Sequence, residues 1–199
     1  GTWVAPDKAI EQSLNPATGE AIGAWHPGSR ALTDQAAREA RSVFFASSWA
    51  HEPRLRAAAL LEIADRIEAA KDEIADLVVA ENGKLRSEAM GETMAAASEA
   101  RYYAGLARNI RGSMQEILPG SLSLFHREPA GVAGIIVPWN APVTLLMRSL
   151  APALAAGDWV ISEACRQLKT WHQAKVRVPK VSVNISARQF SDGQLGMRI

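Results

Sequence analysis

One asparagine lies where a polar side chain can act on a ligand. Asn140 stands in the run Pro138-Trp139-Asn140-Ala141-Pro142, in which two prolines restrict the backbone on either side of it. The preceding run, Ile135 to Val137, is typical of a strand buried in a parallel sheet. Helical spacing follows from Val143 to Ala156 and ends at Gly157, a plausible helix C-cap. Open parallel sheets bind ligands at the carboxyl ends of their strands, so the Asn140 amide is a candidate ligand donor; alternatively, it only forms the turn.

The segments before this unit predict a scaffold that is mainly helical. Turn dipeptides at Asn15-Pro16 and Thr18-Gly19 predict two short strands joined by a turn. Gly112 to Gly120 is expected to be a loop. The helices and one exposed strand are expected at Thr33/Asp34 to about Trp49, Pro53 to Asn82, Lys84 to Arg111, and Ser121 to His126.

Four motifs, in order and correctly spaced, resemble the N-terminal part of the aldehyde dehydrogenase superfamily over about residues 10 to 157. They are Asn15-Pro16-Ala17-Thr18-Gly19-Glu20, Glu81-Asn82-Gly83-Lys84, Arg101-Tyr102-Tyr103-Ala104-Gly105, and Pro138-Trp139-Asn140 within Gly131 to Gly157. The resemblance implies an α/β fold, with a helical scaffold and the beginning of a Rossmann-like parallel sheet. The sheet is incomplete in this chain.

The resemblance also implies a chemistry, the oxidation of an aldehyde to a carboxylic acid with NAD or NADP. In that family a cysteine thiolate attacks the carbonyl, and the oxyanion that forms needs hydrogen-bond donors. Asn140 matches the family's side-chain oxyanion donor. Cofactor-lining positions match Ile136, Val137, Pro138 and Trp139. The segment around Ser121 to His126 matches an arm that pairs subunits, so a homo-oligomer is expected.

The rest of the family's machinery is missing from these residues. No Gly-Gln-x-Cys nucleophile motif and no Glu-Leu-Gly-Gly base motif follows. Glu163 stands where the family has a ribose-binding lysine, and Cys165 comes too early to be the nucleophile. This chain alone is therefore expected to have no dehydrogenase turnover, and whether it is an enzyme by itself stays open.

The tail, residues 158–199, resembles a different family. Trp159 to about Ala174 is expected to form an amphipathic helix. The strand before Pro138 has two candidate neighbours, Trp159–Ile161 and Val181–Ile185. Val181 to Ser186 alternates like a strand, and the run Val-Asn-Ile-Ser-Ala-Arg-Gln-Phe is similar to EAL-type cyclic-di-GMP phosphodiesterase domains. That resemblance implies a piece of a (β/α)8-type barrel in which Asn184 is an oxygen ligand for Mg²⁺. The alternative is a strand-end asparagine that caps a turn.

Composition separates the two parts and limits the function classes. Residues 1–157 carry 15 basic and 18 acidic residues, whereas residues 158–199 carry 7 and 3, which suggests a junction near Gly157/Asp158. The net charge of +1 gives no bias toward nucleic acid or membranes. The single cysteine suits a reducing compartment, and we expect a cytoplasmic protein without a secretory signal. Besides the dehydrogenase part, two hypotheses remain: a module that binds cyclic-di-GMP or Mg²⁺, and a non-catalytic oligomeric interaction protein.

Overall fold

The computed structural model describes residues 10–25 and 27–162. The predicted α/β class is confirmed within these residues, with helices and small, incomplete sheets. In chain order the elements are β1 (Glu11–Leu14), β2 (Ala21–Trp25), α1 (Arg30–Ala46), α2 (Pro53–Ala69), α3 (Lys71–Asn82), α4 (Arg86–Ala107), β3 (Ser113–Leu118), β4 (Ser121–Phe125), β5 (Val132–Ile135), α5 (Pro142–Ala156) and β6 (Trp159–Ser162).

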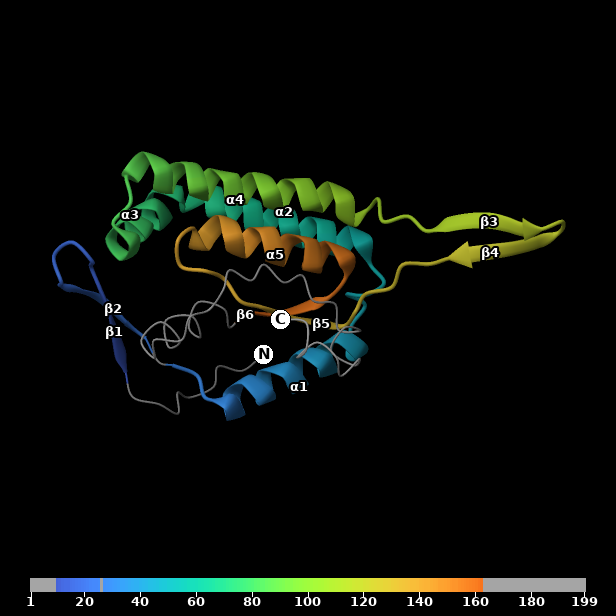
Figure 1. Ribbon diagram of the computed structural model, residues 1–199, viewed down its shortest axis with the longest axis horizontal. Helices are drawn as coiled ribbons and strands as arrows, with labels where there is room; N and C mark the ends of the chain where they lie inside the picture. Colours follow the sequence, from blue (N-terminus) through green and yellow to red (C-terminus); the bar gives the residue numbers. More distant parts are fainter. Residues whose placement is uncertain (1–9, 26, 163–199) are drawn as a thin grey trace.

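The β5–β6 pair lies between two helical layers (Figure 1). Helix α5 contacts both strands on one side, and α1 contacts both strands on the other. Helices α2 and α4 pack in turn on α5, and α3 packs against α4. The small sheet is therefore covered on both faces, as parallel strands require.

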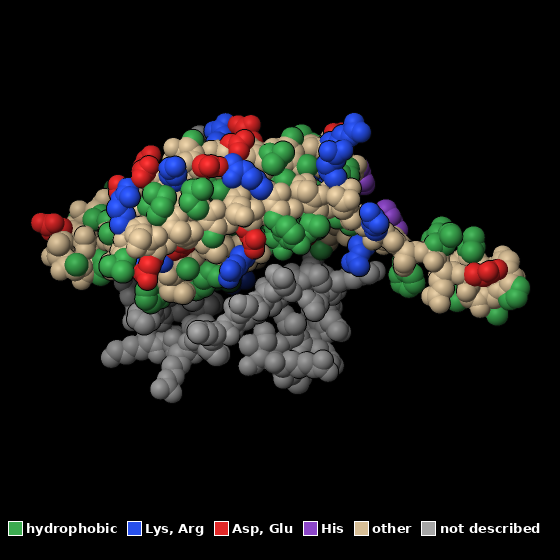
Figure 2. All heavy atoms as spheres, turned by 90° about the horizontal axis from the view of Figure 1, so that it is seen from above, with side chains coloured by type: hydrophobic (Ala, Val, Ile, Leu, Met, Phe, Trp, Pro, Cys, Tyr) green, Lys and Arg blue, Asp and Glu red, His purple; other side chains and the backbone are tan. Residues whose placement is uncertain are grey.

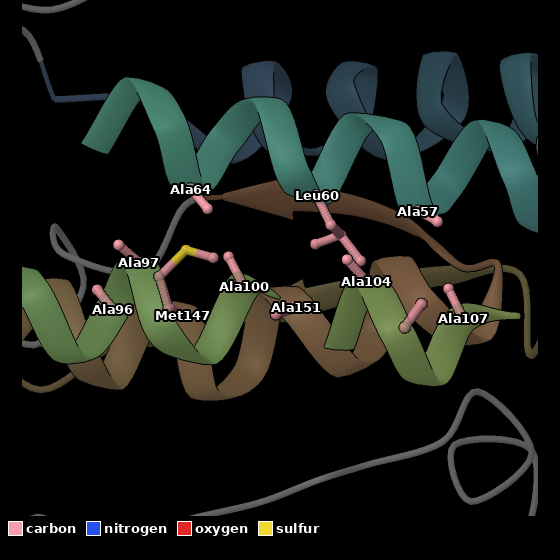
Figure 3. Close-up of a cluster of buried hydrophobic side chains, with 11 residues drawn as sticks. Ala57, Leu60, Ala64, Ala96, Ala97, Ala100, Ala104, Ala107, Met147 and Ala151 are labelled. Carbon is pink, nitrogen blue, oxygen red and sulfur yellow. The ribbon is translucent and has the colours of Figure 1, made fainter. Parts of the chain in front are cut away.

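Alanines dominate the core where α2, α4 and α5 meet (Figure 3). Because an alanine side chain is a single methyl group, the three helices approach closely along these faces. Leu60 is the large aliphatic residue here with no exposed surface, and it points from α2 toward α4. The buried cluster consists of Ala57, Leu60, Ala64, Ala96, Ala97, Ala100, Ala104, Ala107, Met147, Ala151 and Ala155.

Strands β5 and β6 are parallel and are joined by α5, with Val132 opposite Trp159 and Ile135 opposite Ser162. The predicted strand at Ile135 to Val137 is thus shifted, since β5 ends at Ile135. The prediction that Trp159 begins a helix is wrong for Trp159–Ser162, which is β6. A short apolar run fits a strand or a buried helix equally well, and here pairing with β5 decides between them.

Strands β3 and β4 form an antiparallel hairpin that projects from the helical body (Figure 1). The strand expected at Ser121 to His126 is confirmed, but the loop expected at Gly112 to Gly120 is wrong, because Ser113–Leu118 is β3. A left-handed Gly120 (φ +77°) closes the turn and donates its N–H to the Glu116 side chain at 2.7 Å. The arm is rich in apolar side chains (Figure 2), and its exposed ones are Met114, Ile117, Leu118, Leu122, Leu124 and Phe125.

Several helix boundaries differ between the sequence prediction and the structure. Helix α1 begins at Arg30 rather than near Thr33, because the Ser29 hydroxyl accepts from the Leu32 N–H at 3.2 Å. The helix expected from Pro53 to Asn82 is two helices, α2 and α3, separated at Ala70. The other boundaries differ by a few residues, and the β1–β2 turn is confirmed. None of the helices in the described part of the chain is long and apolar enough to cross a membrane.

The alanine-rich core predicts unequal effects at two adjacent leucines of α2. Replacing Leu60 by alanine leaves a cavity that the surrounding alanines cannot fill, so the free energy of unfolding should fall by about 2–5 kcal/mol. The matched control is Leu61→Ala. Because Leu61 is 46% exposed, this change should lower the free energy of unfolding by about 1 kcal/mol or less. Urea denaturation followed by circular dichroism measures both. Equal losses at the two positions would contradict this packing.

Candidate functional site

The turn between β5 and α5 presents most of the predicted site residues to solvent. The side chains of Ile136 and Trp139 are 58% and 66% exposed, and Pro138 and Asn140 are also exposed. Val137 is the exception, since it is 1% exposed and packs with Ile135 and residues of α5. One side chain thus fixes the turn to the core while its neighbours face outward.

Glu92, a buried residue of α4, caps the N-terminus of α5. Helix α5 needs such a partner because Ala141 at its N-cap has no side-chain acceptor. The Glu92 Oε1 accepts from the Val143 N–H at 2.8 Å and from the Thr144 N–H at 3.4 Å. The Thr144 hydroxyl donates to the Glu92 main-chain oxygen at 2.8 Å. The carboxylate therefore meets the positive end of the α5 dipole, an arrangement worth up to about 2 kcal/mol when partly buried.

Lys84 connects the same carboxylate to the Asn140 turn. Its Nζ lies 2.5 Å from Glu92 Oε2 and donates at 2.9 Å to the main-chain oxygen of Asn140. The two charged side chains are 17% and 6% exposed. Removing one partner of a pair this well buried leaves an unpaired charge, which typically costs about 3–5 kcal/mol.

The occupied helix terminus limits how the site can bind anions. A helix N-terminus is ordinarily a ready phosphate site because its first N–H groups are free. Here the Val143 and Thr144 N–H groups already bond to Glu92, and the Leu145 N–H bonds to the Ala141 oxygen. The first N–H groups of α5 are therefore not free to bind an anion at this turn.

The other end of α5 is held by Arg56 of α2, which is buried. Its Nε donates to the Ala155 oxygen at 3.1 Å, and its Nη1 donates to the oxygens of Trp49 and Ala50 at 2.8 and 3.0 Å. Burial lowers the pKa of the Arg56 guanidinium, although an arginine stays charged. The three carbonyls compensate this charge and join the end of α5 to the segment after α1.

Asp158 closes the strand–helix–strand unit. Its Oδ1 accepts from the Gly131 N–H at 2.8 Å, and its main-chain oxygen accepts from the Trp49 indole at 3.1 Å. Trp159 then donates its N–H to the Gly131 oxygen at 2.8 Å. The start of β5 and the start of β6 are thereby fixed side by side.

Glu92 and Lys84 are the site residues that sequence reasoning missed. Lys84 belongs to the motif Glu81-Asn82-Gly83-Lys84, whereas Glu92 lies within the helix expected from Lys84 to Arg111 and belongs to no motif. One signal was available: Ala141 and Pro142 cannot cap α5, so its first N–H groups need a distant acceptor. The sequence does not say which of the many carboxylates supplies it.

No metal centre is found in the part of the chain that the structure describes, where no three His, Cys, Asp or Glu side chains come together. Asn184, the predicted Mg²⁺ ligand, lies outside the described residues.

Comparison with known proteins identifies the class to which this fold and turn belong. The model of the aldehyde dehydrogenase family matches residues 3–170. This match spans most of the chain and includes every element described above, so the chain belongs to the aldehyde dehydrogenase family.

Individual relatives agree with this assignment. An aldehyde dehydrogenase of Enchytraeus buchholzi is 35% identical over 161 residues, which cover 78% of this chain and 32% of that protein. Aldehyde dehydrogenase B of Escherichia coli strain K12 is 34% identical over 169 residues, 83% of this chain and 33% of that protein. The chain thus spans about a third of the length of these curated relatives.

A solved structure has the same fold. A double mutant of Staphylococcus aureus betaine aldehyde dehydrogenase in complex with NAD+ superposes with a TM-score of 0.77 at 28% identity. The alignment covers 90% of this chain and 38% of that one.

The second resemblance, of residues 158–199 to an EAL-type domain, finds no support. The aldehyde dehydrogenase match continues through residue 170, across the expected junction at Gly157/Asp158. Residues 159–162 form β6 of the same sheet as β5. The predicted piece of a (β/α)8 barrel is likewise unsupported, and residues 163–199 lie outside the described part of the chain.

Gly157 supplies a test of how the end of α5 is held. Its φ of +98° is left-handed, and a Cβ there would lie 2.9 Å from Pro129 Cγ and 3.4 Å from the Arg56 guanidinium. Gly157→Ala should therefore lower the free energy of unfolding by at least about 1–2 kcal/mol in thermal denaturation.

The control is Gly91→Ala on α4, where a Cβ meets nothing within 4 Å. That change should stabilise the chain by about 0.4–1 kcal/mol, because alanine favours the helix. A neutral Gly157→Ala variant would show that this connection tolerates a side chain.

Proposed function

We propose that this chain supplies the helical scaffold and the first dinucleotide-fold unit of an NAD(P)-dependent aldehyde dehydrogenase, which oxidises an aldehyde to a carboxylic acid. The observation that carries the proposal is the exposed Asn140 at the end of β5, on a turn hydrogen-bonded to a buried ion pair. Family membership supports the reaction class. The unit would include β6, and so extends past the predicted domain end at residue 157.

Asn140 is assigned the role of oxyanion donor. Attack of a thiolate on an aldehyde carbonyl places negative charge on the carbonyl oxygen, and an amide N–H held in place stabilises that charge. A side-chain amide offers two N–H groups, and in the described part of the chain no hydrogen bond occupies the Asn140 amide. The donor is thus available without first breaking another contact.

The outward face of the turn fits a nicotinamide dinucleotide. Ile136 and Trp139 expose flat or branched apolar surface at the strand's carboxyl end, where planar rings can pack. Pro138 adds rigid apolar surface, and Val137 supports the turn from the core. When bound, NAD or NADP accepts a hydride from the substrate carbon. The binding of NAD+ by the Staphylococcus aureus relative supports this assignment.

The β3–β4 arm is assigned to subunit pairing, and the proposed partner is a second copy of the same protein. Its strands lie outside the helical body and expose apolar side chains such as Leu122, Leu124 and Phe125. An exposed strand edge with apolar surface is a site for association with another strand.

A segment swap tests the catalytic role of Asn140. The host is aldehyde dehydrogenase B of Escherichia coli, with its matching segment replaced by residues 10–162 of this chain. The fusion should form reduced cofactor from an aldehyde panel. Asn140→Ala should lower kcat by about 10²–10³, because one oxyanion donor is lost. Affinity for NAD+ should not change.

Asn109→Ala is the matched control, since Asn109 is an exposed asparagine bonded only locally, to the Gly105 oxygen. The 199-residue chain alone serves as the blank. A folded Asn140→Ala fusion that binds NAD+ and keeps full kcat would overturn the assignment of Asn140.

A further inference from the structure

We propose that Lys84 and Glu92 are positioning residues for Asn140 and act as one unit, here called the brace. The functional meaning of this inference rests on the proposed role of Asn140. The geometric claim stands separately: the brace decides where the Asn140 turn lies relative to the helical scaffold.

Lys84 lies in the short connection between α3 and α4, where the chain reverses direction. Gly83 ends α3 in the left-handed conformation, with φ +69° and its N–H bonded to the Val79 oxygen. Lys84 follows directly and lies largely buried, with its ammonium reaching the Asn140 oxygen, 56 residues away in sequence. Two of its three N–H donors therefore have fixed partners.

Glu92 anchors the other side of the turn. Its two carboxylate oxygens have different partners. Oε1 accepts from the first turn of α5, and Oε2 accepts from Lys84. The segment from Asn140 to Val143 is thus held at both ends, because Lys84 bonds to the Asn140 carbonyl and Glu92 bonds to the Val143 N–H. Glu92 thus bonds the first turn of α5 directly and is linked to the Asn140 carbonyl through Lys84.

Few other contacts hold Asn140. Its side chain is exposed, and in the part of the chain that the structure describes its hydrogen bond is the one from Lys84. Pro138 and Pro142 restrict backbone angles but do not fix the turn to the scaffold. Without Lys84, the Asn140 carbonyl would have only solvent as a partner.

The charges of the brace suit a site where an oxyanion forms. A carboxylate near this turn would by itself oppose negative charge on a ligand, and a free ammonium would compete with Asn140 for it. In the ion pair the two charges compensate each other, so the brace can hold the turn while adding little net electrostatic potential at Asn140. A single lysine or a single glutamate would not do this.

The test measures local order in the 199-residue chain itself. Backbone ¹⁵N order parameters for Asn140 and Ala141 should be near about 0.85 in the unaltered chain. Lys84→Met combined with Glu92→Gln removes the donor to Asn140 without leaving a buried charge, and the glutamine oxygen can still accept from Val143. In this variant the two order parameters should fall below about 0.6, the range of flexible backbone.

Two further variants separate positioning from general stability. Arg86→Met removes a different contact between α3 and α4, the exposed ion pairs with Asp72 and Asp76, and should leave the Asn140 turn ordered. Lys84→Arg keeps donors for both Glu92 and the Asn140 oxygen, so the order parameters at Asn140 and Ala141 should stay near those of the unaltered chain. Thermal unfolding of each variant reports global stability independently.

Unchanged order at Asn140 in the double variant would overturn the proposal, as would equal loosening by Arg86→Met. The result is independent of turnover. Loss of order together with an inactive segment swap would uphold the brace and reject the proposed function. Retained order in the double variant together with an active segment swap would reject the brace and uphold the proposed function.

Discussion

The carboxylate of Glu92 is the contact on which the arrangement of this chain depends. Helix α5 begins at Pro142 and has Ala141 at its N-cap, and neither side chain can satisfy its first N–H groups. Glu92 satisfies them from a neighbouring helix and is itself neutralised by Lys84. The N-terminal end of α5, and with it the β5 turn, is therefore coupled to α4 by one buried side chain. Without that contact, the alanine faces of α4 and α5 would still attract each other, but small methyl groups specify axial position weakly.

The opposite end of α5 is fixed by a different chemistry. Arg56 holds three carbonyls, and Asp158 joins the starts of β5 and β6. One end of the helix thus meets a carboxylate and the other a guanidinium, each of the sign that the helix dipole favours. Between them lies an alanine-rich core that also contains Leu60 and Met147, and the polar contacts at the two ends add specificity to this packing. The exposed Asn140 turn belongs to the end that Glu92 holds.

Local signals in the sequence predicted the elements whose boundaries are set locally. The turn around Asn140, the start of α5 at Pro142 and its end at Ala156, before Gly157, all follow from residue types at fixed positions. The stretch from Trp159 was predicted both as the start of a helix and, over Trp159–Ile161, as a neighbour of the strand before Pro138, and pairing with β5 decides for the strand. The partner of the α5 N-terminus could not be predicted, because Glu92 is about 50 residues away and resembles other acidic residues on α4. A resemblance over a short tail was also misleading, whereas four ordered motifs gave the correct family.

Hydrogen exchange at the first turn of α5 tests the central claim most directly. If Glu92 accepts from Val143 and Thr144, these two amides should exchange as slowly as amides inside α4 in the unaltered chain, although the first amides of a helix are ordinarily unprotected. Exchange at the rate of an unstructured peptide, while α4 stays protected, would contradict the account.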